Sequence, residues 1–245
     1  MIPPAVSVRT AIDVVDRALV LTKRHFWTLL RLSAIPLLAA TGVGYWYGGV
    51  GHPPLIRALA ALAAYSLYAI LYAVTILGAW TLLHGQAVDV AATWYLVYQR
   101  SPSIVVAFVV KMALVLLGIV ALILPGFYFV AIYFAVPAVN VVEGLGVRRS
   151  LVRSRALARG SMLGIIVSIG GVWVLAIVAA NLVPVILTRL GVPHGTPLRF
   201  VVAMLWPALV VPFQCALAAV MYLELRVRRE GYDLEQVMSS MPSAA

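Results

Sequence analysis

The chain has 245 residues, of which 64% are hydrophobic and 11% are charged, with a formal net charge of +10 and a mean hydropathy of +1.04. Soluble domains are about half apolar and about a quarter charged, so this composition excludes a soluble protein and indicates a chain that lies in lipid. Hydrocarbon requires every backbone polar group to be paired within the protein, which leaves helices or a closed barrel. Long apolar runs, rather than short alternating strands, predict an all-α integral membrane protein.

Six apolar runs approach or exceed the length that crosses about 30 Å of hydrocarbon. We expect transmembrane helices at residues 27–47, 58–83, 104–124, 127–142, 162–188 and 200–225. The fourth run is short and contains Pro137, so we expect it to be tilted, broken or re-entrant. Only Pro125 and Gly126 separate it from the third run, which predicts a tight helical hairpin.

Three polar-and-apolar segments precede the first, third and fifth runs, and each has apolar residues at helical spacing. Residues 7–26 carry Ser7 as an expected N-cap and an apolar stripe of Val8, Ile12, Val15, Leu19 and Phe26. Residues 89–100 carry Asp89 as an expected cap and a stripe of Val90, Trp94 and Val97. Residues 145–160 carry a stripe of Val147, Leu151, Ala158 and Met162, with arginines on the opposite side. We therefore expect three amphipathic helices at the membrane surface.

The order of these elements suggests a repeated unit, a surface helix followed by a helical hairpin, which occurs three times. We expect residues 1–237 to form a single multi-pass membrane domain and residues 238–245 to be a disordered tail. With the N-terminus inside, all 18 Lys and Arg residues except Arg57, Arg189 and Arg199 fall on the inner side. The positive-inside rule then predicts a protein of the cell inner membrane with both termini in the cytoplasm.

The densest positive charge lies in the third surface segment, which carries five arginines: Arg148, Arg149, Arg153, Arg155 and Arg159. An arginine-rich amphipathic helix lies at the interface and attracts anionic headgroups, and the guanidinium grips phosphate at two points. We interpret these residues as a phospholipid headgroup-binding surface. The same pattern is compatible with arginines that only enforce topology, or that bind a protein or nucleic-acid partner. The aromatic side chains of a single-strand binder are not interleaved here, so we expect no nucleic acid.

Several polar residues lie within the apolar runs. Lys111 is a functional candidate because intramembrane charge is costly; it could instead extend to the interface or pair with Glu143 or Glu224. Asn140, Asn181 and Gln214 are interpreted as hydrogen-bonding contacts between helices. We expect Glu143 to anchor the turn into the arginine-rich helix by pairing with an arginine or with Lys111. Cys215, the single cysteine, is expected in the core.

The stretch PGFYFVAIYFAVPAVNVVEGLGVRRSLVRSRALARGSMLG resembles the membrane region of some prokaryotic glycerophosphodiester phosphodiesterases and of related stand-alone multi-pass proteins. The matching residues are Pro125, Gly126, Val141, Val142, Glu143, Gly144, Arg153, Ser154, Leu157 and Gly160. The close of the chain, MYLELRVRREGYDLEQV, is also similar, through Tyr222, Leu225, Arg226, Arg229, Glu230, Gly231, Asp233 and Leu234. The resemblance implies the membrane module without the hydrolase, because the soluble catalytic barrel of those enzymes is absent.

No sequence motif indicates catalysis or a cofactor. The four histidines, His25, His52, His84 and His194, stand alone and lack a carboxylate at metal-ligand spacing. We therefore expect a non-enzymatic membrane protein without a metal or cofactor. It would associate with anionic phospholipid or support a membrane complex, with a membrane-protein partner or a second copy as its partner. The alternative is a transporter or lipid translocase, in which Lys111, Asn140 and Gln214 line a cavity between the hairpins.

Overall fold

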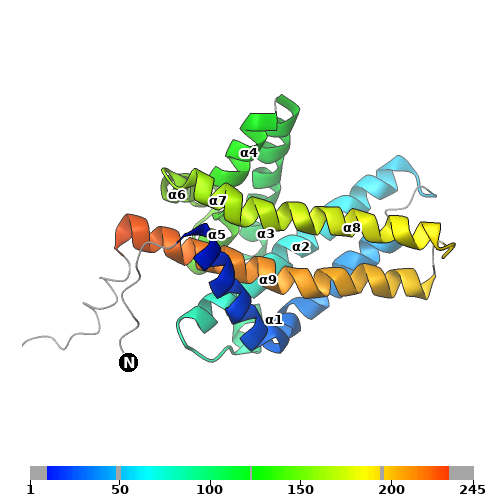
Figure 1. Cartoon of the computed structure of the whole chain (residues 1–245), viewed down its shortest axis with the longest axis horizontal. Coiled ribbons are helices and arrows are strands. Elements are labelled where there is room, and N and C mark those ends of the chain that lie inside the picture. The colour runs from blue at the N-terminus through cyan, green and yellow to red at the C-terminus, as the bar shows by residue number, and fades with distance from the viewer. Residues whose placement is uncertain (1–9, 48–50, 122, 194–195, 232–245) are drawn as a thin grey trace, which may run out of the picture.

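The computed structural model describes residues 10–47, 51–121, 123–193 and 196–231, and every regular element within these ranges is helical. Figure 1 shows their arrangement. The elements are α1 (Ala11–Tyr47), α2 (Pro54–Leu83), α3 (Val90–Ala121), α4 (Ile123–Ile132), α5 (Val136–Val142), α6 (Val147–Ala158), α7 (Met162–Ile165), α8 (Gly171–Arg189) and α9 (Pro197–Glu230). A π-helical turn, Ile166–Gly170, joins α7 to α8.

Six helical stretches are long and apolar enough to cross a membrane, which confirms the six predicted runs. They are Ala11–Tyr47, Pro54–Leu83, Val90–Ala121, Pro125–Val142, Met162–Arg189 and Pro197–Glu230. Their identification as candidate spans rests on length and hydropathy, because about 20 apolar residues in helical geometry match the thickness of the hydrocarbon layer. The predicted tail, 238–245, lies outside the described residues.

The fourth stretch is broken, one of the outcomes that its short length predicts. Helix α4 ends at Ile132, a turn follows, and α5 begins at Val136. Pro137 lies in the first turn of α5, where a proline is tolerated because its missing N–H would have no partner in the helix. The predicted linker, Pro125-Gly126, is instead helical, within the start of α4. A Cβ on Gly126 would lie 3.1 Å from the backbone of Ile119, so this glycine allows α4 to contact α3 closely.

Only the third predicted amphipathic segment forms a helix of its own, α6. The first two continue into the following spans as parts of α1 and α3, and α1 bends at His25, whose φ is −121° and ψ is 23°. Asp89 caps α3 as predicted, because its Oδ1 accepts from the backbone N–H of Ala92 at 3.1 Å. The predicted cap Ser7 lies outside the described residues. At the described start of α1, the Oδ2 of Asp13 accepts from the backbone N–H of Thr10 at 2.8 Å.

The apolar stripes predicted for the first and third segments coincide only in part with the faces that pack: Ala158 is buried and Val15 is partly buried, but other stripe residues are exposed or half-buried. In the first part of α1, residues 11–26, the buried residues are Val14, Ala18 and Thr22, while Ile12 is 78% exposed and Leu19 is exposed as well. In α6 the buried residues are Ser150, Ser154, Leu157 and Ala158. In lipid, small side chains mark the contacting face because they let backbones approach, whereas large apolar side chains can remain in lipid. The stripe of the second segment, residues 89–100, also holds in part, since Val97 is buried and Val90 is exposed.

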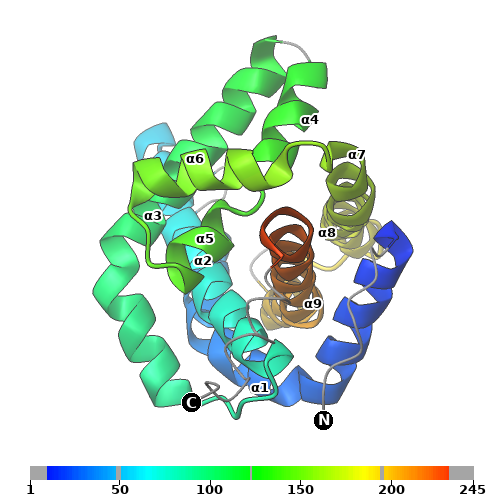
Figure 2. The same cartoon turned by 90° about the vertical axis from the view of Figure 1, so that its left-hand side faces the viewer.

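Helix α9 forms the centre of one end of the molecule. Viewed end-on in Figure 2, its C-terminal half is surrounded by α1, α2, α5, α6 and α8. The buried side chains of this half include Cys215, as predicted, and Tyr222, which is also fully buried. Helices α8 and α9 run side by side along the long axis in Figures 1 and 2.

The hairpin formed by α3 and α4 departs from that axis. In Figures 1 and 2 it projects at a large angle to α8 and α9, and exposed apolar residues such as Val120 and Phe127 cover it. The three helical hairpins predicted from the sequence are therefore present in chain order, but the middle one does not run parallel to the last. If α8 and α9 cross the bilayer along their axis, the α3–α4 hairpin lies closer to the membrane plane.

Candidate functional site

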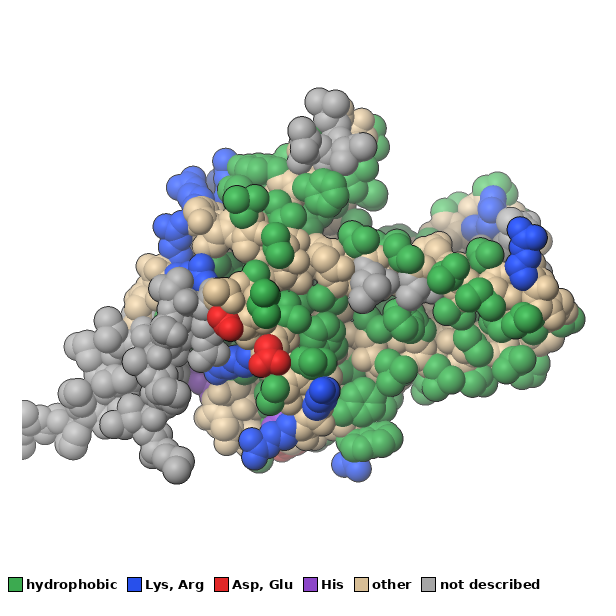
Figure 3. Space-filling view, viewed as in Figure 1, with side chains coloured by type: hydrophobic (Ala, Val, Ile, Leu, Met, Phe, Trp, Pro, Cys, Tyr) green, Lys and Arg blue, Asp and Glu red, His purple; other side chains and the backbone are tan. Residues whose placement is uncertain are grey.

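Helix α6 lies across one end of the molecule, next to the C-terminal half of α9 (Figure 2). Its exposed side carries Arg148, Arg149 and Arg155, and Arg159 follows at its C-cap, also exposed. We call these four residues the arginine surface. In Figure 3, basic side chains (blue) cluster over α6, and a second group lies where α8 ends. Hydrophobic side chains cover most of the surface between these two groups.

Arg153, the fifth predicted headgroup ligand, is engaged inside the protein. Its Nε lies 3.1 Å from the Oε2 of Glu143, its Nη1 pairs with Glu230, and 32% of its side chain is exposed. Tyr222 donates a hydrogen bond from its hydroxyl to Oε1 of Glu143. We call Glu143, Arg153, Tyr222 and Glu230 the polar clasp. It joins the turn after α5 to α6 and to the end of α9.

The two acids of the clasp stabilise the charged form of Arg153. Burial lowers the pKa of its guanidinium, but the hydrogen bonds and charges of Glu143 and Glu230 outweigh burial and raise the pKa overall. Of the alternatives that the sequence left open for Glu143, the structure therefore pairs it with an arginine, not with Lys111. Two further ion pairs lie along α9 at i,i+4 spacing: Arg228–Glu224 at 2.8 Å and Arg226–Glu230 at 3.2 Å.

Two glycines shape the turns on either side of α6. Gly144 has a φ of +67° and Gly160 a φ of +72°, a left-handed conformation that side chains disfavour. A Cβ on Gly144 would lie 2.9 Å from Nη1 of Arg100, which donates to the carbonyl of Val141 at 3.0 Å. A Cβ on Gly160 would lie 2.8 Å from Nη2 of Arg229. The clasp therefore lies between two turns that each contain a glycine in the left-handed conformation.

Asn140 forms hydrogen bonds between elements, which agrees with its interpretation from the sequence as a hydrogen-bonding contact between helices. Its Nδ2 donates to Ser103 Oγ at 3.1 Å and to the carbonyl of Leu145 at 2.9 Å, so it joins α5 to α3 and to the following turn. Ser154 adds to this packing by donating to the carbonyl of Ile132 at 2.7 Å. Asn181 was expected to bond between helices, but it is exposed and donates within α8, to Ile177.

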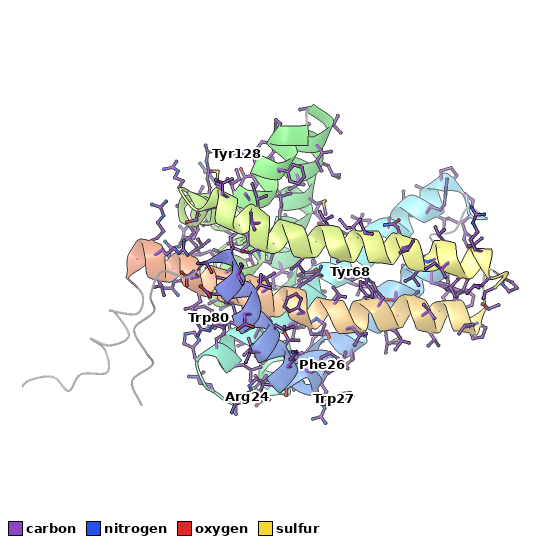
Figure 4. The ribbon with its side chains drawn as sticks, in the orientation of Figure 1. Arg24, Phe26, Trp27, Tyr68, Trp80 and Tyr128 are labelled. Carbon is purple, nitrogen blue, oxygen red and sulfur yellow. The ribbon has the colours of Figure 1, made fainter. Side chains whose placement is uncertain are left out.

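A cavity of about 420 Å³ lies between α2, α3, α5, α8 and α9. Three tyrosines of α2 line it at helical spacing, Tyr65, Tyr68 (labelled in Figure 4) and Tyr72. Its polar and aromatic lining also includes Lys111, Trp173 and Gln214. Of the residues predicted to line a cavity, Lys111 and Gln214 therefore lie in it, and Asn140 does not. These tyrosines were not among the residues predicted from the sequence to line a cavity. Their spacing along one helix face, which is visible in the sequence, is the signal that could have identified this wall of the cavity.

Lys111 has a ring contact and no recorded ion pair in the described part of the chain. Its Nζ lies 5.4 Å from the centroid of the Phe108 ring. The predicted pairs with Glu143 and Glu224 do not form, because those acids bind Arg153 and Arg228. Tyr72 donates to Oε1 of Gln214 at 2.6 Å, a contact between α2 and α9 of the kind predicted for Gln214.

The six long apolar helices define a multi-pass α-helical membrane protein. Comparison of the chain with protein-family models, with curated proteins and with solved structures finds no significant match. The resemblance to the membrane region of glycerophosphodiester phosphodiesterases therefore stays a prediction.

Proposed function

We propose that this protein is a non-enzymatic inner-membrane module whose arginine surface binds anionic phospholipid headgroups, with both termini in the cytoplasm. The observation that carries the proposal is that one of five neighbouring arginines is paired inside the protein while the other four are exposed. Arg153 is held by two acids, while Arg148, Arg149, Arg155 and Arg159 are exposed at the same end of the molecule. Four exposed guanidinium groups on a short helix form a concentrated positive field that suits phosphate.

Apolar side chains exposed at the same end support contact with a membrane interface rather than with water. Val152 is 65% exposed although it lies among the arginines of α6. In α1, Ile12 and Val20 are exposed, and Trp27 projects near the bend of the helix beside Phe26 and Arg24 (Figure 4). Tryptophan and arginine beside exposed apolar residues are typical of segments at the headgroup layer.

The test is native mass spectrometry of the protein extracted gently from its own membrane. Each basic residue near an anionic surface contributes about 1 kcal/mol, so removing four should abolish retention of an anionic lipid. We expect the wild type to carry a stoichiometric anionic phospholipid and a variant with Arg148, Arg149, Arg155 and Arg159 changed to Gln to lose it. Arg189→Gln, at the opposite end of α8, is the matched control and should retain the lipid. Equal lipid retention in the wild type and the four-residue variant would contradict the proposal, leaving the arginines as topology determinants.

The proposed topology can be tested with single cysteines, because the native Cys215 is buried and should not react. A membrane-impermeant maleimide added to intact cells should label Gly51→Cys, beyond α1, and should label Arg155→Cys only after permeabilisation. Ala121→Cys, at the end of α3, reports on the tilted hairpin. Labelling of Ala121→Cys in intact cells shows that the hairpin crosses, and protection shows that it stays within or below the bilayer. Labelling of Arg155→Cys in intact cells would contradict the proposed orientation.

The cavity favours a second candidate function, a transporter or lipid translocase. Its lining includes a cation, an amide and tyrosines at the junction of several helices, and such convergent polar groups in an apolar cavity are typical of ligand sites. Asn140, which that alternative also invoked, contributes to packing instead. A transport function first requires a ligand that fits this cavity.

A further inference from the structure

We propose that the cavity between α2, α3, α5, α8 and α9 binds one single-chain amphiphile with an acidic head group, a carboxylate or a phosphate, which pairs with Lys111. This site is independent of the arginine surface, since it shares no residue with it and lies between the long helices. The argument rests on the charge of Lys111, the size and lining of the cavity, and its access from the lipid-facing surface.

The charge of Lys111 requires a partner that the described protein residues do not supply. The ammonium group lies over the Phe108 ring, and the two acids that the sequence suggested as partners, Glu143 and Glu224, bind Arg153 and Arg228 instead. A cation within an apolar layer is costly unless it is paired. An acidic head group in the cavity would provide that pairing as a charge-assisted hydrogen bond, which is about twice as strong as a neutral one.

The cavity has the dimensions and lining of a site for one apolar chain. Its volume of about 420 Å³ lies in the lower half of the range of about 300–1,000 Å³ typical of small-molecule sites. Most of the wall is apolar, and it includes Phe134, Ile169 and Val211 in addition to the tyrosines of α2. A single chain with one charged end matches a wall that offers one cation and otherwise apolar and aromatic side chains.

Gln214 provides a second polar contact for the head group. Its side chain is only 8% exposed, and its carbonyl oxygen accepts from Tyr72. No acceptor is recorded for its amide nitrogen within the described ranges, and buried amides normally use both donor and acceptor. The Gln214 amide is therefore available to donate to a carboxylate or phosphate oxygen.

An amphiphile can reach the cavity from the bilayer. Ile177 and Ala180 line the cavity from α8, and both are exposed, Ile177 by 55%, so the cavity is open to the surface along this helix. The wall of the cavity thus continues onto the apolar surface that faces lipid. A chain could enter sideways through this wall without passing through water.

The test uses three probes that share one chain: oleate, oleoyl lysophosphatidate and the neutral oleyl alcohol. Protein in nanodiscs of neutral lipid is titrated with each probe, and binding is measured by tryptophan fluorescence and by native mass spectrometry. We expect one acidic probe per protein and weaker binding of the alcohol. Comparison of the two acids shows whether a carboxylate or a phosphate fits better.

Substitutions at Lys111 and Ala176 distinguish the contribution of the Lys111 charge from that of the cavity volume. Lys111→Met retains the length of the side chain and should weaken both acidic probes by at least about tenfold, the loss of one charge-assisted contact, while leaving the alcohol unchanged. Lys111→Arg should retain binding of the acids. Ala176→Phe fills the cavity with Lys111 intact and should weaken all three probes. The four-arginine variant should bind the acids as the wild type does.

The proposal is overturned if Lys111→Met binds oleate and lysophosphatidate as tightly as the wild type, or if the alcohol binds the wild type as tightly as oleate. Removal of an unpaired charge should leave the unfolding temperature unchanged or raise it, which guards against a trivial loss of structure. If Lys111→Met nevertheless unfolds, Ala176→Phe decides: undiminished acidic binding in that variant would overturn the site.

Discussion

Replacing Arg153 by Met should lower the free energy of unfolding by about 2 kcal/mol, because it removes the centre of the polar clasp. The side chain bonds two acids that are themselves largely shielded, Glu143 at 17% and Glu230 at 21% exposed. Removing one partner of a shielded pair leaves the other charge without compensation, which costs more than an exposed pair contributes. Tyr222 and Arg226 retain their bonds to these acids, so the loss is partial. Unfolding by SDS titration in micelles measures it.

Arg155→Met is the matched control, since it removes the same group from the exposed side of the same helix and should change the free energy of unfolding by less than about 0.5 kcal/mol. A double-mutant cycle with Glu143→Gln then isolates the Arg153–Glu143 contact. Equal effects of Arg153→Met and Arg155→Met would show that the clasp does not stabilise the fold. A purely topological role for the arginines also predicts no difference between them.

The positions of the spans were predictable because a helix that crosses the hydrocarbon layer needs about 20 consecutive, mostly apolar residues, and such runs can be read directly from the sequence. The same physics explains which helix faces were not predictable. Water no longer drives large apolar residues inward, so Ile12 remains exposed while Ala18 and Ser154 pack. Small residues at helical spacing, rather than the most apolar stripe, were the relevant signal.

The roles of the arginines depend on tertiary structure. Arg153 and Arg149 differ by four positions in one helix and look equivalent in the sequence, but only Arg153 meets Glu230 at the far end of the chain. That contact requires α9 to lie under α6, which no local pattern specifies. The pairs within α9 were predictable because residues four apart on a helix are neighbours by geometry alone.

The cavity was predictable in part. Lys111 and Gln214 stood out as polar residues in apolar runs, and Tyr65, Tyr68 and Tyr72 share one face of α2. The angle of the α3–α4 hairpin, which decides how Lys111 meets α8 and α9, depends on how the hairpin packs as a body (Figure 1). Asn140 resembled Gln214 in sequence context, but its position in α5 directs it to Ser103 and Leu145 instead.

Replacing Gly144 by Ala should lower the free energy of unfolding by about 2–3 kcal/mol, the sum of two effects. Its φ of +67° costs an alanine about 1–2 kcal/mol, and the new Cβ would press on Arg100 and weaken its bond to Val141, adding about 1 kcal/mol. Thermal unfolding in detergent measures the change.

Gly146 provides the control for this turn because its φ is −68° and a Cβ there would meet nothing within 4 Å. Gly146→Ala should therefore lower the free energy of unfolding by only about 1 kcal/mol, the usual cost of placing alanine at the N-cap position that Gly146 holds in α6. Adding Arg100→Ala to Gly144→Ala separates the two effects: if the collision matters, the double variant loses less than the two single losses combined. Equal stability of Gly144→Ala and Gly146→Ala would mean that the turn into α6 does not require the left-handed conformation.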